Sequence, residues 1–170
     1  GGLTGLPLGL ASADIHLHDT YYVIGHFHYV VAPRTLLALF AGIYYWFPKV
    51  TGMKLNEALG KVHFWGTIIG MNLVFFPMLI QGMAGVSRRM YDGGAQYDHA
   101  APVLFLNEWM SWGAWIIGIF QVVFIVNLFW TLKKKEMVSG NVWEATTLEW
   151  AAAPSPPIAH GNFPILPEVF

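Results

Sequence analysis

Long apolar stretches separated by short polar segments form the main pattern of this chain. A helix needs about 20 apolar residues to cross a bilayer. Three stretches are long enough, at residues 21–47, 62–86 and 109–132. Only the first holds a charged residue, Arg34, and it also holds His26, His28 and Pro33. The pattern therefore predicts an all-α membrane protein with three transmembrane helices, the first of which carries unusual polar residues.

Polar segments flank and connect these spans. We expect residues 1–20 to form a loop outside the membrane, and residues 48–61, with three lysines, to form a short loop with a turn. Residues 87–102 form a longer polar loop that contains Arg88-Arg89. Residues 133–170 begin with three lysines and contain five prolines. Because proline disfavours regular structure, we expect this tail to lie extended on a partner surface.

Composition agrees with a location in the membrane. The chain of 170 residues is 55% hydrophobic and only 11% charged, whereas soluble domains carry about 25% charged residues. It has no cysteine, which excludes disulfides, thiolate metal sites and thioether-linked haem. The net charge of −1 gives no indication of nucleic acid. No basic segment precedes an apolar core at the N-terminus, so we expect no signal peptide, and either a processed start or a piece of something larger.

The placement of lysine and arginine predicts the orientation. Six basic residues lie on one side of the three spans: Lys49, Lys54, Lys61, Lys133, Lys134 and Lys135. The opposite side has only Arg88 and Arg89. We therefore expect the lysine side to be cytoplasmic, or the matrix side in a mitochondrion. His18 and Asp19 then share the outer side with the two arginines.

Two histidines two residues apart, His26 and His28, are the most informative feature of the first span. Because a helix advances about 100° per residue, their side chains point about 200° apart. They cannot easily bind one metal ion, but they can bind two cofactors, one on each side. Neutral imidazole is a common axial ligand of haem iron. The alternative is that both are hydrogen-bonded packing residues. The remaining histidines are interpreted as ordinary loop, interface or tail residues: His16, His63, His99 and His160.

His18 and Asp19 directly precede the first span. One interpretation is that Asp19 caps the helix by accepting bonds from its free N–H groups. The other is a hard-cation site with carboxylate and imidazole ligands. Two adjacent residues cannot fill an octahedral shell, so water or another subunit must supply the other ligands.

The three arginines need separate explanations. Arg88 and Arg89 are either a solvated pair at a helix end or a pair that binds carboxylates, such as haem propionates, in a fork geometry. Arg34 lies well inside the first span, where an arginine costs roughly 3 kcal/mol. It needs an acid or a carbonyl on a neighbouring helix, and we find no obvious partner in this chain.

Several of these motifs resemble haem–copper cytochrome c oxidase subunit I. Residues 18–22 followed by His26-Phe27-His28 are similar to the tenth helix of that subunit. The resemblance continues in the same order through residues 1–5, 46–48, 61–64, 88–91 and 146–150. It implies that the chain is the C-terminal quarter of a twelve-helix subunit, helices ten to twelve, with the other nine spans on a separate N-terminal part. Pro33 and Arg34 depart from the family pattern.

The resemblance also implies roles for individual residues. His26 would be the proximal ligand of a high-spin haem where oxygen reacts, and therefore catalytic. His28 would be an axial ligand of a low-spin haem. The remaining roles would be magnesium binding by His18 and Asp19, and contacts with haem propionates by Arg88, Arg89 and Asp14. Both haems are expected to be of the haem A type, and copper would have its ligands outside this chain.

The function implied by the resemblance is that of a respiratory terminal oxidase. Electrons from cytochrome c would pass through a copper centre in subunit II, and oxygen would be reduced to water with proton translocation. The partners would be the N-terminal part of subunit I and subunits II and III, and the chain alone would be inactive. We expect a bacterial plasma membrane rather than a mitochondrial inner membrane. The alternatives are a quinol-fed oxidase, a non-catalytic membrane scaffold and, with little support, a transporter.

Overall fold

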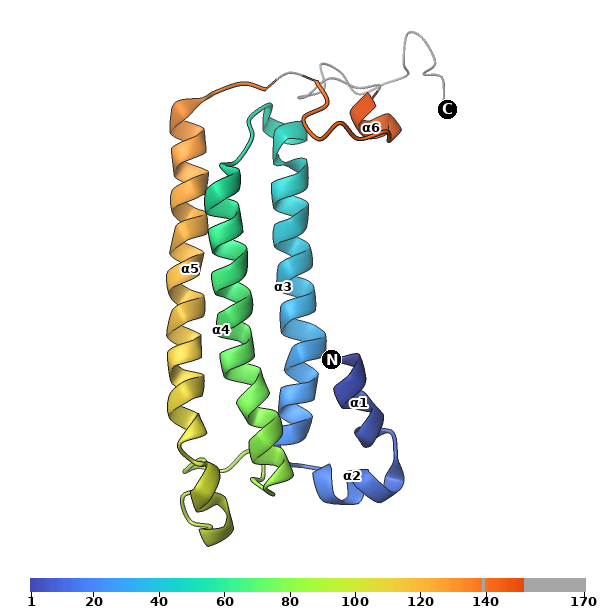
Figure 1. The fold of residues 1–170 in the computed structure, drawn as a ribbon, viewed down its shortest axis with the longest axis vertical. Coiled ribbons are helices and arrows are strands. Elements are labelled where there is room, and N and C mark those ends of the chain that lie inside the picture. Colours follow the sequence, from blue (N-terminus) through green and yellow to red (C-terminus); the bar gives the residue numbers. More distant parts are fainter. Residues whose placement is uncertain (139, 152–170) are drawn as a thin grey trace. The chain divides into compact units, whose positions relative to one another are not determined.

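The structure is a computed structural model that describes residues 1–138 and 140–151. These residues form helices joined by connecting segments of different lengths (Figure 1). The elements are α1 (Gly2–Leu8), α2 (Ala11–Leu17), α3 (Tyr21–Thr51), α4 (Glu57–Met83), the 3₁₀ helix η1 (Asp98–Val103), α5 (Leu106–Lys134) and α6 (Leu148–Ala151). The described residues contain no β-strand, only two isolated bridges, Thr20 with Ser87 and Met53 with Met137.

Three helices, α3, α4 and α5, are long and apolar enough to cross a membrane. This confirms the prediction of an all-α chain with three spans in the described residues. Their ends differ from the predicted ones, because α3 continues to Thr51, α4 begins at Glu57, and α5 begins at Leu106 and ends at Lys134. Hydropathy locates only the apolar part of a helix, whereas lysine and glutamate are good helix formers that continue it into water. The loop predicted for residues 48–61 is therefore only residues 52–56.

The prediction of a loop over residues 1–20 is wrong in its local structure, because α1 and α2 occupy most of this segment. Each has seven residues, and helices this short leave little periodic signal in the sequence. The tail also contains the one-turn helix α6. The expectation of an extended tail concerns mainly residues 152–170, which lie outside the described residues. His160 lies outside them as well.

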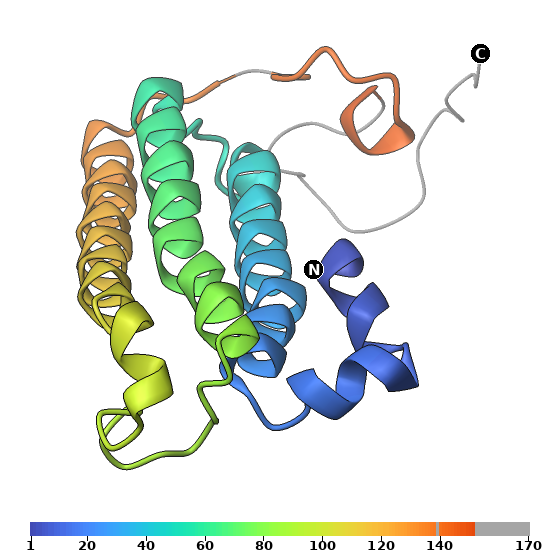
Figure 2. The same cartoon turned by 60° about the horizontal axis from the view of Figure 1, so that its bottom comes forward.

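The chain divides into two compact units, which we describe separately. The first consists of Gly1–Leu37 and His63–Val122. In it, α2 runs across the N-terminal end of α3, and α1 lies beside the same part of α3 (Figures 1 and 2). At the contact between α3 and α4, Gly82 lies so close to Tyr22 that a Cβ atom would overlap the Tyr22 backbone. The absence of a side chain at Gly82 thus permits this close approach.

The second unit consists of Ala38–Val62 with Val123–Phe170. In its described part, the Trp143 ring stacks on Tyr45 at 6.0 Å between centroids and 10° between planes, and Trp143 Nε1 donates to Tyr45 O at 3.0 Å. Trp150 is 1% exposed, and Lys49 Nζ lies 5.2 Å from the centre of its ring. Stacking, hydrogen bonding and cation–π contact thus attach the segment after α5 to the C-terminal part of α3.

Candidate functional site

His26 and His28 contact two different neighbours from the same helix, α3. His26 Nδ1 lies 2.9 Å from Thr4 Oγ1 on α1. The His28 ring stacks on Phe75 of α4 at 5.0 Å between centroids. The two imidazoles thus lie on different faces of α3, as the spacing of two residues requires.

The hydroxyl of Thr4 determines which nitrogen of His26 carries the hydrogen. Thr4 Oγ1 donates its one hydrogen to Gly1 O at 2.9 Å. It can therefore only accept from His26, so that Nδ1–H of the imidazole is the donor. In this tautomer Nε2 keeps its lone pair, which is the state of a histidine that binds a metal.

His28 reaches the same state within its own helix. Its Nδ1 lies 2.8 Å from the backbone oxygen of Ile24, one turn earlier. A carbonyl oxygen can only accept, so Nδ1 carries the hydrogen and Nε2 keeps its lone pair. Both histidines therefore fit the chemistry of axial ligands to haem iron, which neutral imidazoles provide in many proteins.

An ion pair joins Asp19, at the N-terminal end of α3, to the loop after α4. Arg88 Nη2 contacts Asp19 Oδ1, and His18 Nε2 lies 3.3 Å from Asp19 Oδ2. The backbones are joined as well, since Arg88 N donates to Asp19 O at 2.9 Å and Tyr21 N donates to Val86 O at 2.9 Å. The structure thus brings together three of the predicted outer-side residues.

Asp19 does not cap α3. Tyr22 N donates to Thr20 Oγ1 at 3.2 Å, so threonine is the capping side chain. Asp19 itself has a positive φ of 57°, in the left-handed region where aspartate is tolerated. Of the two interpretations of Asp19, capping is therefore wrong, and its carboxylate is directed to Arg88 instead.

The ligand set for magnesium is incomplete within the described residues. No group of three histidine, aspartate or glutamate side chains in the described part could hold a metal ion. An ion bound by His18 and Asp19 needs further ligands from outside this set, and it would compete with Arg88 for the Asp19 carboxylate. The Nε atom of Arg88 is buried and has no hydrogen-bond partner within the described residues, so this arginine can still donate to an acceptor.

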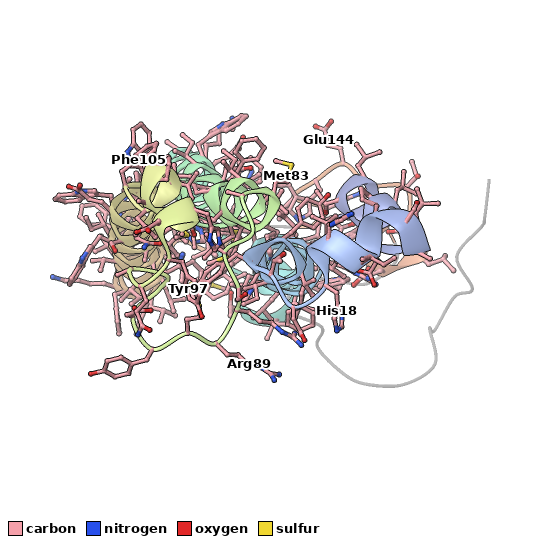
Figure 3. The ribbon with its side chains drawn as sticks, turned by 90° about the horizontal axis from the view of Figure 1, so that it is seen from below. His18, Met83, Arg89, Tyr97, Phe105 and Glu144 are labelled. Atoms are coloured by element: carbon pink, nitrogen blue, oxygen red, sulfur yellow. The ribbon has the colours of Figure 1, made fainter. Side chains whose placement is uncertain are left out.

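Arg89 and Asp14 are not part of this cluster. Arg89 is exposed, with a positive φ of 63°, and its side chain points away from the ribbon on the same side as His18 (Figure 3). Asp14 is half-buried in the first turn of α2. No side-chain hydrogen bond or ion pair of Asp14 occurs among the described residues.

Sequence reasoning missed several polar contacts. It assigned no role to Thr4, and a single threonine in a glycine-rich segment gives no signal for one. It treated His63 as an ordinary residue, but His63 is 2% exposed and contacts Gln121 across α4 and α5 at 3.3 Å. Gln121 Nε2 in turn donates to Thr67 Oγ1 at 3.2 Å. The signal available in the sequence was the presence of His63 and Gln121 in two spans that are otherwise apolar.

Comparison with known proteins places these residues in a family. The model of the family described as "Cytochrome C and Quinol oxidase polypeptide I" matches residues 1–116. Cytochrome c oxidase subunit 1 of Synechocystis sp. is 48% identical over 158 residues, which cover 93% of this chain and 27% of that protein. Alternative cytochrome c oxidase subunit 1 of Bradyrhizobium diazoefficiens is 44% identical over 163 residues, covering 96% and 27%. Quinol oxidase subunit 1 of Bacillus subtilis is 39% identical over 171 residues, covering 99% and 26%. The chain thus spans only 26–27% of the length of these three relatives.

Proposed function

The chain belongs to the cytochrome c and quinol oxidase polypeptide I family, and we propose that it supplies one axial ligand to each of two haems in a terminal oxidase. The observation that carries this proposal is the state of the two imidazoles on α3. They lie on different faces, and each has its Nδ1 hydrogen bonded to a local oxygen. Nε2 of each ring then carries the lone pair that would bind iron.

The two histidines take different roles in this proposal. His26 is the proximal ligand of the high-spin haem and is held by Thr4. His28 is a ligand of the low-spin haem and is held by Ile24 O and the Phe75 ring. The bound haems would supply electron transfer and, together with copper whose ligands lie outside this chain, the reduction of oxygen to water. Phe27 lies between the two histidines in the sequence, about 100° from each of them around the helix.

Five residues expected on the outer side support the haems in this proposal. Arg88 and Arg89 bind propionates, and Asp14 contributes near the high-spin haem. His18 and Asp19 bind magnesium with further ligands from outside the described residues. The free Nε of Arg88 supports the first assignment. The ion pair between Arg88 and Asp19 means that binding of a propionate or of magnesium has to rearrange this pair.

Cytochrome c is the proposed electron donor. The relatives named above include two cytochrome c oxidase subunits, at 48% and 44% identity, and one quinol oxidase subunit, at 39%. The presence of a subunit II with a two-copper site decides between the two donors. The complex then contains the remaining spans of subunit I, a subunit II with a copper centre and a subunit III, and it couples oxygen reduction to proton translocation. Because these relatives are bacterial, the proposed location is a bacterial plasma membrane. The proposed haems are of the A type.

Optical spectroscopy of the purified complex tests the haem ligands. His28→Ala should remove the low-spin haem signal, because this haem loses an axial ligand. His26→Ala should leave the low-spin signal and disturb the binding of ligands at the oxygen-reacting haem. His16→Ala, an exposed position in α2, serves as the matched control and should leave both signals unchanged. An unaltered low-spin spectrum in the His28 variant would contradict the assignment of His28 as a ligand of this haem.

A further inference from the structure

Arg34 is a charged residue deep in the most polar of the three spans. It lies thirteen residues after Tyr21 and seventeen before Thr51 in α3. At 1.5 Å per residue, the ends of the helix are about 20 Å and about 26 Å away. If a hydrocarbon core about 30 Å thick is centred on the helix, Arg34 lies about 12 Å inside its nearer boundary. A side chain at this depth cannot place its guanidinium among the lipid headgroups.

The face of α3 that carries Arg34 is exposed in the described part of the chain. Phe27, Val31 and Arg34 follow one another at intervals of four and three residues, so they lie on one side of the helix. Phe27 is 56% exposed and Val31 is 43% exposed, and Arg34 is also exposed. We call these three residues the arginine face. The contacts with α1 and α4 described above involve His26 and His28 instead.

The guanidinium on this face needs an anionic partner. Arginine stays protonated in proteins, so it cannot become neutral as a buried lysine can. Among the described residues, no hydrogen bond or ion pair of Arg34 occurs. The only carboxylates in the three spans are Glu57 and Glu108, each in the first turn of its helix. Glu57 is already paired with Lys61 at 2.9 Å.

We propose that Arg34 forms an ion pair, within the membrane, with an aspartate or glutamate on a transmembrane segment outside these 170 residues, and that this segment covers the arginine face. A lipid phosphate is excluded by depth. A backbone carbonyl of a neighbouring helix can accept a hydrogen bond with its second lone pair, but it carries no net charge and so cannot neutralise the guanidinium. A carboxylate neutralises the charge and matches the fork of the guanidinium with two parallel hydrogen bonds. The inference rests on the proposed function only in requiring a larger membrane complex, and it does not depend on the haem ligands.

Replacement of Arg34 by methionine in the assembled complex provides the first test. Arg34→Met keeps an unbranched side chain and removes the charge, so the partner carboxylate is left unpaired in an apolar environment. The yield of assembled complex should fall by about tenfold or more. The amount of chain inserted in the membrane should stay constant or rise, since the variant is more apolar. Leu36→Met, which lies about 200° from Arg34 around α3 and is 39% exposed, is the matched control and should assemble as the parent does.

A second set of variants identifies the partner. Arg34→Met is combined, one at a time, with Asp→Asn or Glu→Gln changes in the membrane spans of the rest of the complex. One combination should restore the yield at least several-fold, because it removes the unpaired charge. The proposal is overturned if Arg34→Met assembles like Leu36→Met, or if no combination restores the yield. A parent complex without haem would contradict the proposed function but leave this test valid.

Discussion

At the scale of single residues, the state of each imidazole depends on one hydrogen bond. His28 finds its acceptor within its own helix, four residues earlier, and this pairing is available to any histidine in an α-helix. His26 uses a side chain 22 residues away in the sequence. Sequence spacing therefore indicated where the two rings point, but it could not indicate that Thr4 orients one of them.

Removal of the Thr4 hydroxyl should affect one haem only. Thr4→Val removes the acceptor of the His26 Nδ1 hydrogen and leaves the size of the side chain nearly unchanged. In the assembled complex, retention of the high-spin haem should fall by about tenfold, as for other second-shell changes around a metal ligand. The iron–histidine vibration measured by resonance Raman should shift to lower frequency, while the low-spin spectrum stays constant.

Thr4→Ser is the matched control for this change, because serine keeps the hydroxyl. It should retain the vibration of the parent complex. An unshifted vibration in Thr4→Val would show that Thr4 does not orient His26.

At the scale of elements, the close packing of α3 and α4 depends on the position of a glycine. Apolar length predicted the three long helices, because a span of about 20 apolar residues is a local property of the sequence. It did not predict which helices touch. Gly82 on α4 meets Tyr22 on α3 at a distance that leaves no room for a Cβ atom, and nothing in the sequence distinguishes Gly82 from the other glycines of the chain.

Two glycine-to-alanine changes should have opposite effects on stability. Gly82→Ala forces a methyl group against the Tyr22 backbone and should destabilise the protein by about 1–3 kcal/mol. Gly118→Ala in α5 places a methyl group in open space and should stabilise the protein by up to about 1 kcal/mol, through helix propensity. Thermal unfolding in detergent measures both. Equal midpoints for the two variants would contradict the close contact of α3 and α4 at Gly82.

At the scale of the whole molecule, the orientation in the membrane is a consequence of charge placement. Six lysines are expected on the cytoplasmic side, and Arg88 and Arg89 on the outer side. Arg88 forms an ion pair with Asp19. This ion pair accounts for the position of Arg88 at the end of the spans opposite the lysines. The orientation itself stays a prediction.

Single cysteines can test the orientation, because the chain has no cysteine of its own. Gln96→Cys lies in the loop between α4 and α5, and Glu136→Cys lies just after α5. Both positions are exposed. A membrane-impermeant maleimide should label Gln96→Cys in intact cells and label Glu136→Cys only after permeabilisation, because the two positions lie on opposite sides. The reverse pattern of labelling would show that the orientation is opposite to the proposed one.

The amino-acid sequence by itself determined the number of spans, the opposite directions of His26 and His28, and the presence of Arg34 deep in the first span. These properties follow from apolar length and from the helical repeat, which act within a few residues. Only the tertiary structure decided that Thr4 orients His26, that Arg88 pairs with Asp19, and that Thr20 rather than Asp19 caps α3. The first two contacts join residues far apart in the sequence. The third was a choice between two adjacent polar side chains, which depended on whether Asp19 had a partner elsewhere in the fold.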